Sequence, residues 1–495
     1  MKKHLFSFIL LSAILMSQAF AQAPDTIWTY KYNGPSNYDD NANYCAIDNT
    51  GHLYVTGSTL VSGSGNNYIT IKIDAATGDT IWIRTYNGPA NDHDYANCCT
   101  VDTFGYLYVT GTSSNGANTD YLTIKYDGNT GDTIWTRRYN GSADGTDKAY
   151  GCAVDNNNLY VTGVSFGSGN FFTIKYNTTT GDTIWTHRYG PGSGSDYANA
   201  CAVDSLGNLY VTGYIDNGVN RDFCTIKYNS STGDTLWIKK YNGPANGNDY
   251  AHGCAVDGSG NLFVTGSVYN GTNNDYLIIR YNPTNGDTVW TRSYNGAANQ
   301  NDVARGCKVD QYGNLFITGA SNNGSNSDIL TIKYNPLNGD TIWTCRYNIP
   351  SNAHQGAMSC DIDQAGNLYV VGYNDNGTND DILAIKYNTA TGVTGKPELP
   401  STNHKICLEQ NYPNPIKKYT NISYQLPIAG YSSLVVYNIA GQKINTLVNE
   451  RQDAGVYNIN WNGRDESGNH ASAGIYFYQL KIGDNIITRK MTLIR

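Results

Sequence analysis

The sequence predicts an all-β protein: a seven-bladed β-propeller closed by its N-terminal strand, followed by a small Ig-like β-sandwich. Three observations support this prediction. Seven tryptophans recur at intervals of 50–54 residues. Each interval holds four short β-branched and aromatic segments separated by turn residues. Composition then changes after Gly395, because all four glutamates of the chain lie beyond it. Charged residues make up only 15% of the chain, and its net charge of −8 comes with no basic cluster, so nucleic acid is not an expected partner.

The first 23 residues have the pattern of an export signal. Lys2 and Lys3 precede an apolar run from Leu5 to Met16, and small residues follow at Ala21 and Ala23. The run is shorter than the roughly 20 residues that a membrane-spanning helix needs, and no longer one follows. We therefore expect a secreted chain without a transmembrane segment, with residues 1–23 as its signal peptide.

The repeat unit extends over residues 24–395. Its tryptophans are Trp28, Trp82, Trp135, Trp185, Trp237, Trp290 and Trp343. In one copy the four segments are CAVD (201–204), LYVTG (209–213), FCTIKY (223–228) and DTLWIKKY (234–241). An all-β repeat of about 50 residues can bury both faces only against its neighbours, which favours propeller blades. Because blades diverge from the axis, small residues belong inside and bulky ones outside, which predicts the strand order CAVD, LYVTG, TIKY, DTIW from axis to rim.

The turn after the first segment also repeats. An Asp follows the repeated Cys by three residues in every copy, and a Gly follows that Asp by three residues in six copies, which predicts a type I turn. Asn158 stands in the Gly position of the one remaining copy, the third, where we expect it to adopt the left-handed conformation.

The two ends of the repeat region complement each other. The chain after residue 23 opens on a DTIW segment (25–28), and the last copy stops after AIKY (384–387). Joining these ends completes a seventh blade and removes an open seam of unpaired strand edges.

These repeats resemble a known family. CAVDSLGNLYVTG, Asp222, TIKY, a Gly turn, Trp and YNGP resemble the bacterial SBBP-type β-propeller repeat, and the first three segments are also similar to NHL repeats. The resemblance implies a propeller and an extracytoplasmic location. It implies no single activity.

A second domain is expected at residues 405–495, after a Pro-containing linker at 396–404. Its alternating segments are 421–427, 433–444, 455–461, 474–482 and 489–494, as in a small antiparallel sandwich. QNYPNP, VVYNIAGQ, AGVYNINWNGRD, SAGIYFYQL and RKMTLIR resemble, in this order, the type A C-terminal sorting domain of the type IX secretion system. The resemblance implies export across the outer membrane of a Bacteroidota-type bacterium, with the type IX machinery as partner, and release or surface attachment.

Acidic residues of the repeats are recurrent rather than unique. An Asp stands five residues before the Cys in six copies (Asp40, Asp94, Asp147, Asp196, Asp249 and Asp302) and another opens the third segment in five (Asp120, Asp222, Asp275, Asp328 and Asp381). We interpret both sets as structural hydrogen-bonding groups, because a catalytic pair is needed only once. The alternative is calcium held by the loops DNGVNRD and DNGTNDD, with Asp216, Asp222, Asp375 and Asp381 as ligands. We expect no other cofactor.

Seven of the eleven cysteines occupy one equivalent position, Cys45, Cys99, Cys152, Cys201, Cys254, Cys307 and Cys360. We expect small buried side chains there rather than disulfides, because equivalent positions on adjacent blades should exceed the Cα separation of about 7 Å that a bridge allows. Cys98, Cys224, Cys345 and Cys407 have no assigned role.

One variable position is a candidate for ligand binding. Three residues before each repeated Cys the chain has Ala in all copies, whereas the next residue varies. These residues are Asn43, Asn97, Tyr150, Asn199, His252, Arg305 and Met358. Just before the inner strand, they should ring one mouth of the channel, where Tyr150, His252 and Arg305 offer stacking, titratable and anion-pairing groups. The alternative is a solvated loop.

The leading hypothesis is an exported, non-catalytic propeller that binds an extracellular glycan or protein, on the cell surface or released from it. One alternative is an extracellular polysaccharide hydrolase or lyase that uses Asp, His and Tyr at a channel mouth. Another is a calcium-dependent glycan-binding adhesin. An enzyme should concentrate its deviations in one or two blades, whereas this chain deviates mildly in all of them, which favours binding.

Overall fold

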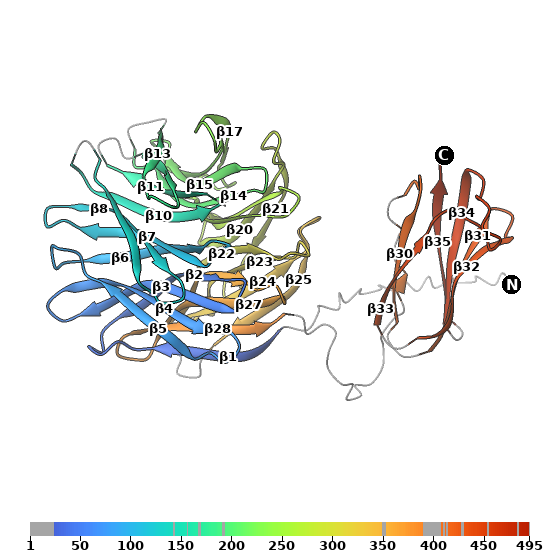
Figure 1. Ribbon diagram of the computed structural model, residues 1–495, viewed down its shortest axis with the longest axis horizontal. Coiled ribbons are helices and arrows are strands. Elements are labelled where there is room, and N and C mark those ends of the chain that lie inside the picture. Colours follow the sequence, from blue (N-terminus) through green and yellow to red (C-terminus); the bar gives the residue numbers. More distant parts are fainter. Residues whose placement is uncertain are drawn as a thin grey trace, which may run out of the picture. The chain divides into compact units, whose positions relative to one another are not determined.

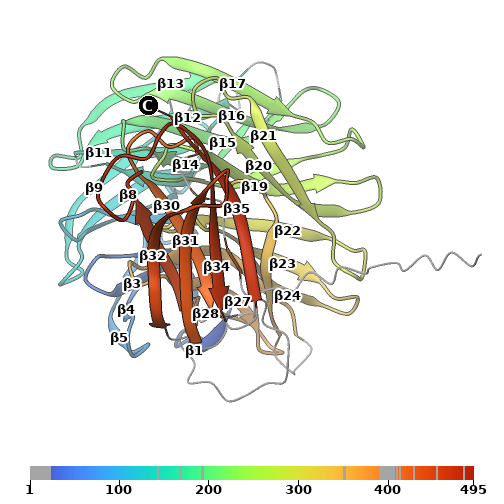
Figure 2. The same ribbon diagram turned by 90° about the vertical axis from the view of Figure 1, so that its right-hand side faces the viewer.

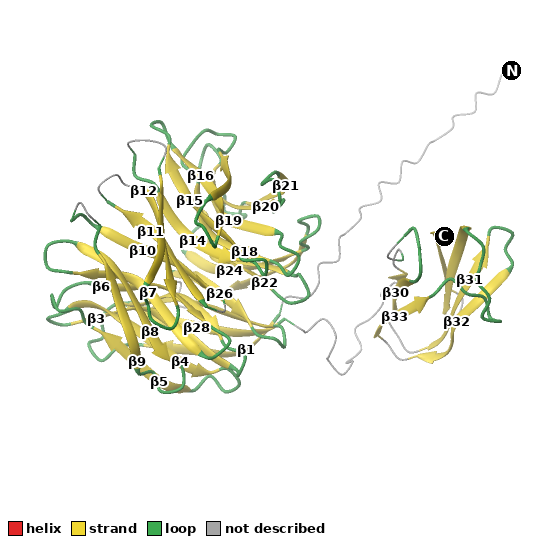
Figure 3. Cartoon of the chain, turned by 45° about the horizontal axis from the view of Figure 1, so that its top comes forward, coloured by secondary structure: helices red, strands yellow, loops and turns green. Residues whose placement is uncertain are grey.

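The computed structural model describes residues 24–494 except 142–143, 156, 167–169, 191–193, 349–352, 390–406, 409–410, 412–413, 427–429, 453–454 and 483–484. The predicted signal peptide and linker therefore lie outside the described residues. The chain divides into two compact units, one up to Gly392 and one from Val393 onward. In the described ranges every regular element is a β-strand (Figure 3). No helix in that part of the chain is long and apolar enough to cross a membrane.

The first unit is a ring of seven four-stranded antiparallel sheets. Within each sheet, or blade, the strands follow one another from the axis of the ring to its rim. Blade 1 is β2 Asp40–Ile47, β3 His52–Val61, β4 Gly65–Asp74 and β5 Thr80–Tyr86; blade 2 is β6 Asp94–Val101, β7 Tyr106–Ser114, β8 Thr119–Asp127 and β9 Thr133–Tyr139; blade 3 is β10 Asp147–Val154, β11 Asn158–Ser165, β12 Asn170–Asn177 and β13 Thr183–Tyr189. Blade 4 is β14 Tyr197–Val203, β15 Asn208–Asp216, β16 Arg221–Asn229 and β17 Thr235–Tyr241; blade 5 is β18 Tyr250–Val256, β19 Leu262–Tyr269, β20 Asn274–Tyr281 and β21 Thr288–Tyr294. Blade 6 is β22 Asp302–Val309, β23 Leu315–Asn322, β24 Ser327–Tyr334 and β25 Thr341–Tyr347; blade 7 is β26 Gln355–Ile362, β27 Asn367–Asp375, β28 Asp380–Asn388 and β1 Asp25–Tyr32.

Blade 7 confirms both the predicted strand order and the predicted closure. Strand β1 pairs antiparallel with β28, from Asp25 opposite Asn388 to Tyr32 opposite Ile382. Figure 1 shows the two strands side by side, dark blue and orange, although more than 300 residues separate them in the sequence. Trp28 and Tyr30 pack against the buried core shared by blades 7 and 1. The N-terminal strand therefore leaves no open seam in the ring.

Neighbouring blades are held together by a recurring pair of donors that we call the Trp–Lys clamp. In blade 1 the Trp82 indole and the Lys72 ammonium both donate to the Gly128 carbonyl of blade 2, at 3.3 and 2.8 Å. Across the closing seam, Trp28 and Lys386 donate in the same way to the Ala75 carbonyl, at 3.2 and 2.7 Å. The Trp ring also packs on the aromatic residue of the second strand of its own blade, as in Tyr54–Trp82 at 6.0 Å. These contacts explain why Trp and Lys recur.

The turn between the first and second strands is closed in six blades by a hydrogen bond from the repeated Gly to the repeated Asp, as a β-turn requires. In blade 1 the Gly51 N–H donates to the Asp48 carbonyl, and Gly51 has a φ of +87°. The prediction for Asn158 is wrong. Asn158 is the first residue of β11, and its carbonyl accepts the Asp155 N–H. In blade 1 the equivalent carbonyl belongs to His52, which accepts the Asp48 N–H. The turn of blade 3 is one residue shorter, so the glycine position is missing rather than filled by Asn.

The second unit is the expected Ig-like sandwich. One sheet contains β29 Cys407–Leu408, β30 Thr420–Leu426 and β33 Gly455–Trp461; the other has the order β32 Lys443–Gln452, β31 Gly430–Asn438, β34 Gly474–Ile482 and β35 Asn485–Leu493. Figure 2 shows the strands of this second sheet in a row. The expected single strand at 433–444 is interrupted, because a turn at Gly441 separates β31 from β32. The buried Trp461 lies between the sheets, in a core with Leu434, Tyr478 and Met491.

Candidate ligand-binding cavity

The seven variable residues are placed by a β-bulge that every inner strand shares. The pairing between first and second strands loses register between the invariant Ala and the residue two positions later, for example between Ala42 and Tyr44. The same shift occurs at the same position in the other six blades. Asn43 and its counterparts are therefore inserted residues without a partner in the ladder, and a bulge of this kind redirects a side chain. They lie inside the inner strands, not just before them as the sequence suggested.

A glycine in the second strand makes the bulge possible. Gly57 pairs with Ala42, and a Cβ atom at Gly57 would lie 1.8 Å from the Asn41 carbonyl oxygen. The corresponding glycine of blade 4, Gly213, has the same close approach, 1.8 Å from the Tyr197 oxygen. A glycine within a strand pattern indicates a bulge or a close backbone approach. The Gly of the LYVTG segment therefore indicates the β-bulge of the first strand in the sequence itself.

One cavity of about 580 Å³ collects all seven inserted residues. They lie on the inner strands of all blades, so the cavity occupies one mouth of the channel. The loops that join second to third strands leave the sheet at the same end, since Tyr214 pairs with Tyr197 directly before the loop at 217–220. The volume falls within the range of about 300–1,000 Å³ that is typical of small-molecule sites.

Three of the inserted residues have a structural task. The side-chain amides of Asn43, Asn97 and Asn199 donate to the carbonyl of the invariant Ala in the next blade, at 2.8, 2.7 and 2.8 Å. Each amide thus joins two blades at the mouth. The remaining four blades replace Asn by Tyr150, His252, Arg305 and Met358, which differ in shape, charge and polarity.

His252 lies among these four but is not titratable in the physiological range. Burial and, secondly, the positive charge of Arg305 lower its pKa from 6.5 to about 3. The imidazole is therefore neutral, and its hydrogen-bonding capacity is what it offers. Burial also lowers the pKa of Arg305, but a guanidinium group stays charged in proteins.

An aromatic arc extends along one side of the cavity. We use this name for Tyr150, Tyr197, Tyr214, Tyr250 and His252, from blades 3, 4 and 5. Successive ring centroids are 6.0, 5.0, 4.9 and 6.2 Å apart, with stacked rings in the second and fourth pairs. Sequence comparison of the repeats pointed to only two of these residues, because the others lie at positions where the copies differ without pattern.

Arg221 completes the arc. Its guanidinium carbon lies 5.2 Å from the Tyr214 ring centroid and 5.7 Å from that of Tyr250, and its Nη1 donates to the Tyr250 hydroxyl at 3.2 Å. The corresponding residues before the Asp of the third strand are Thr119, Asn274, Ser327 and Asp380. Arg221 is therefore a departure of blade 4, visible in the sequence only once its neighbours in space are known.

A second cavity of about 340 Å³ continues the channel. It shares Tyr44, Cys152, Cys201 and Cys254 with the first cavity. Here Lys308 and Asp361 replace the small residue that follows the Cys in other blades, and their charged atoms lie 3.0 Å apart. The second Asp361 oxygen accepts the Ile47 N–H at 3.1 Å, so the pair links blades 6, 7 and 1.

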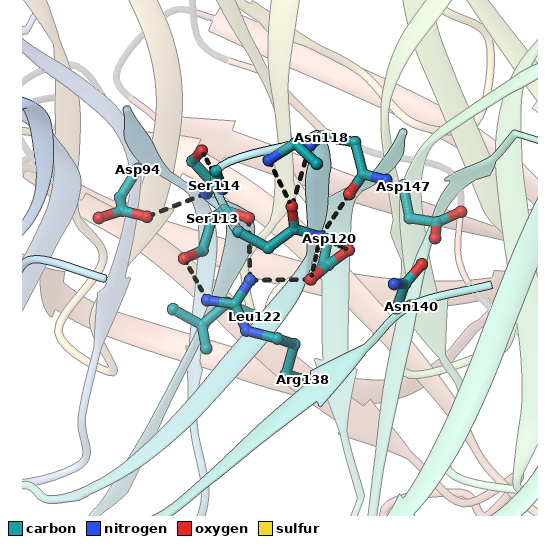
Figure 4. Close-up of polar contacts among 12 residues, drawn as sticks. Asp94, Ser113, Ser114, Asn118, Asp120, Leu122, Arg138, Asn140 and Asp147 are labelled. Atoms are coloured by element: carbon teal, nitrogen blue, oxygen red, sulfur yellow. Dashed lines mark hydrogen bonds and ion pairs between the residues drawn. The ribbon is translucent and has the colours of Figure 1, made fainter. Parts of the chain in front are cut away.

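The recurrent Asp residues are engaged in hydrogen bonds. Figure 4 shows Arg138 between Asp120 and Ser113; its Nη1 lies 2.9 Å from the Asp120 carboxylate and 3.1 Å from the Ser113 carbonyl. Asp94 accepts the backbone N–H of Gly88 and of Ser114. These bonds are those expected of the structural interpretation.

The four calcium candidates make bonds within their own loops. Asp222 and Asp381 accept the amides of Asn217 and Asn376, at 2.8 and 3.0 Å. Asp216 and Asp375 each accept a backbone N–H two residues later. In the described ranges no group of three His, Cys, Asp or Glu side chains could hold a metal ion. Calcium binding by these loops stays a prediction.

The ten cysteines whose side chains the structure describes form no disulfide. Burial raises the pKa of the Cys254 thiol to about 12, and it raises that of Cys360 to the same value. These groups are neutral thiols in the channel wall at neutral pH. The side chain of Cys407 lies outside the described residues.

Comparisons with known proteins agree with this architecture. The family model of the outer membrane protein assembly factor BamB matches residues 173–411, and that of the FlgD Ig-like domain matches residues 417–484. The chain therefore resembles BamB in its propeller and FlgD in its C-terminal domain. No curated protein matches the chain.

Two solved structures are among those that match the chain. Hydrazine synthase of Kuenenia stuttgartiensis has 11% identity and a TM-score of 0.50, over 70% of this chain and 96% of that one. PorZ, a surface component of the type IX secretion system of Porphyromonas gingivalis, has 12% identity and a TM-score of 0.34, over 91% of this chain and 70% of that one. The first of these similarities indicates a shared fold and nothing about activity.

Proposed function

We propose that the protein is an exported, non-catalytic binding module whose ligand enters the 580 Å³ cavity at the channel mouth. The observation that carries this proposal is the β-bulge, which directs one residue of every blade into a single cavity. Arrays of fixed backbone with one variable side chain per unit are suited to recognition.

The composition of the cavity favours binding over hydrolysis. A glycoside hydrolase of the usual kind needs two carboxyl groups flanking the bond that breaks. Among the described residues that line the cavity there is neither Asp nor Glu. The one Asp of the second cavity, Asp361, is paired with Lys308. A lyase would instead need a base, and with a pKa of about 3 the His252 imidazole is a weak one.

Location and partner follow from the sequence. The export signal at 1–23 and the resemblance of 405–495 to a type A sorting domain support transit through a type IX secretion system, followed by display on or release from the cell. The Ig-like domain is the part of the chain that the secretion machinery would recognise. Calcium-dependent adhesion by the loops at 216–222 and 375–381 is an alternative.

The test is a screen of the purified protein against extracellular glycans and proteins, with calcium and with a chelator in separate arms. Replacing Tyr150, His252 and Arg305 together by Ala should weaken binding of a hit at least tenfold, about 1.4 kcal/mol, without altering thermal stability. Replacing Tyr312, Phe104 and Leu206 by Ala is the control, because these exposed side chains lie in the turns after the first strands. Unchanged affinity in the first variant would contradict the cavity as the site. Sustained formation of reducing ends or unsaturated sugars would contradict the non-catalytic assignment.

A further inference from the structure

We propose that the cavity takes a carboxylate-bearing sugar ring, a uronate unit of an acidic polysaccharide, with the carboxylate on Arg305 and the ring against the aromatic arc. This inference rests on the proposed function, since it names a ligand class for the same cavity.

The charge of the residues that line the cavity favours an anionic ligand. The described residues that line the cavity include two guanidinium groups, Arg221 and Arg305, and no carboxylate. The whole chain, in contrast, has a net charge of −8. A cavity lined by two guanidinium groups and no carboxylate attracts anions, because its low-dielectric walls focus the local field.

Among the described residues, Arg305 has no acidic partner of the kind that Arg138 and Arg346 have. Arg138 and Arg346 each lie 2.9 Å from an Asp carboxylate. In the described part of the chain, Arg305 forms no such ion pair, although it is half-buried in the channel. A planar guanidinium can bind a carboxylate through two parallel hydrogen bonds.

The shape and surface of the cavity specify a ring. Tyr150, Tyr197, Tyr214 and Tyr250 provide aromatic surface from three adjacent blades. A pyranose ring has an apolar C–H face that packs on such surfaces and a rim of hydroxyl groups that needs polar partners. The neutral His252 and the Tyr hydroxyls offer those partners without adding a competing charge. Arg221, held over Tyr214 and Tyr250, leaves a second positive charge at the side of the arc for a neighbouring uronate.

The experiment measures binding to the full mature chain by calorimetry, with four probes: a uronate oligosaccharide, its carboxyl-reduced neutral counterpart, a sulfated oligosaccharide of equal length and a poly-aspartate peptide. We expect the uronate oligosaccharide to bind at least tenfold more tightly than the other three. Arg305→Gln should weaken its binding at least tenfold, and Arg305→Lys should restore part of the loss. Arg292→Gln, which removes the same charge from the rim strand β21, should leave binding unchanged.

Several results would overturn the inference. They are equal affinity for the neutral counterpart, tighter binding of the sulfated probe or the peptide, unchanged affinity in Arg305→Gln with an unchanged melting temperature, and no binding of the uronate probe. The proposed function is tested separately by the Tyr150, His252 and Arg305 triple variant. If the neutral probe binds and that variant loses it, the cavity is still the binding site and only the ligand class is wrong.

Discussion

Among the described residues, Asp196 lacks the hydrogen bond from the backbone N–H six positions earlier that its five Asp counterparts accept. In blades 1 and 2 the backbone N–H of Gly34 and of Gly88 donates to the equivalent carboxylate, at 2.5 and 2.6 Å. In blade 4 the described residues offer Asp196 only the N–H of Asp216, and its Oδ2 atom is buried without a partner. Burial therefore raises the pKa of Asp196 from 3.8 to about 6.

We predict that Asp196→Asn stabilises the protein at pH 7.5 and reduces the pH dependence of stability. Because the folded pKa lies above the unfolded value, the native carboxyl binds its proton more tightly, so its stabilising contribution is complete below about pH 4 and is lost as the pH rises through about 6. The gain at pH 7.5 is at most about 3 kcal/mol, since each pKa unit is worth about 1.4 kcal/mol. Urea denaturation at pH 4.5, 6 and 7.5 measures it. Asp79→Asn, in an exposed turn, is the control. A parallel shift of both variants at all three pH values would contradict this account.

At the scale of the strand, closure depends on β1 and its Trp28. The strand supplies the rim of blade 7, and its indole forms one half of the Trp–Lys clamp on the Ala75 carbonyl. The residue before it, Ile27, is the inserted residue of a second bulge and is 48% exposed. Ile27 is thus exposed, whereas its neighbour Trp28 is half-buried against the core of blades 7 and 1.

We predict that a chain starting at Pro35 loses several kcal/mol of stability, because it exposes the edge of β28 and the aromatic surface that Trp28 covers. Trp28→Ala alone should cost about 2–4 kcal/mol, whereas Ile27→Ala in the same strand should change stability by less than about 0.5 kcal/mol. Thermal and urea unfolding measure all three. A truncated chain as stable as the intact one would contradict closure by β1.

The predictable part of this structure is the part that repeats. Trp28 and the AIKY ending were enough to predict blade 7, since each blade is a copy of its neighbours. Constant Ala beside a variable residue was enough to predict a ring that includes Arg305. Arg221 and Tyr214 were not predicted, because they lie on different strands from the ring and meet it only through the fold. Lys308 and Asp361 break the repeat visibly, but their pairing requires the geometry of two blades.

At the scale of the whole molecule, the chain consists of two units with different composition. The propeller has no Glu between residues 24 and 397, whereas the four glutamates lie in the part that follows. The Ig-like domain has its own core around Trp461. We propose two tasks for these two units, recognition for the first and routing for the second.

We predict that residues 405–495, fused behind a reporter that carries an export signal, direct the reporter out of a host with type IX secretion. The resemblance to a sorting domain extends over the whole Ig-like domain, and the propeller contains no such motif. Immunoblots of medium, surface and periplasm measure the distribution. The same reporter without residues 405–495 is the control. Periplasmic retention of the fusion, with normal export of the host's own cargo, would contradict the prediction.

The inserted residue of each inner strand has a consequence for how this protein can change. Since Asn43 and its counterparts have no partner in the ladder, exchanging one of them alters the wall of the cavity while the strand pairing on either side stays the same. Exchanging one of the three Asn residues would remove a hydrogen bond that joins two blades. Tyr150, His252, Arg305 and Met358 do not make this bond, so exchanging them removes no such hydrogen bond between blades. Four positions of the propeller can therefore be exchanged to change the cavity wall and its specificity, while the strand pairing that holds the fold is kept.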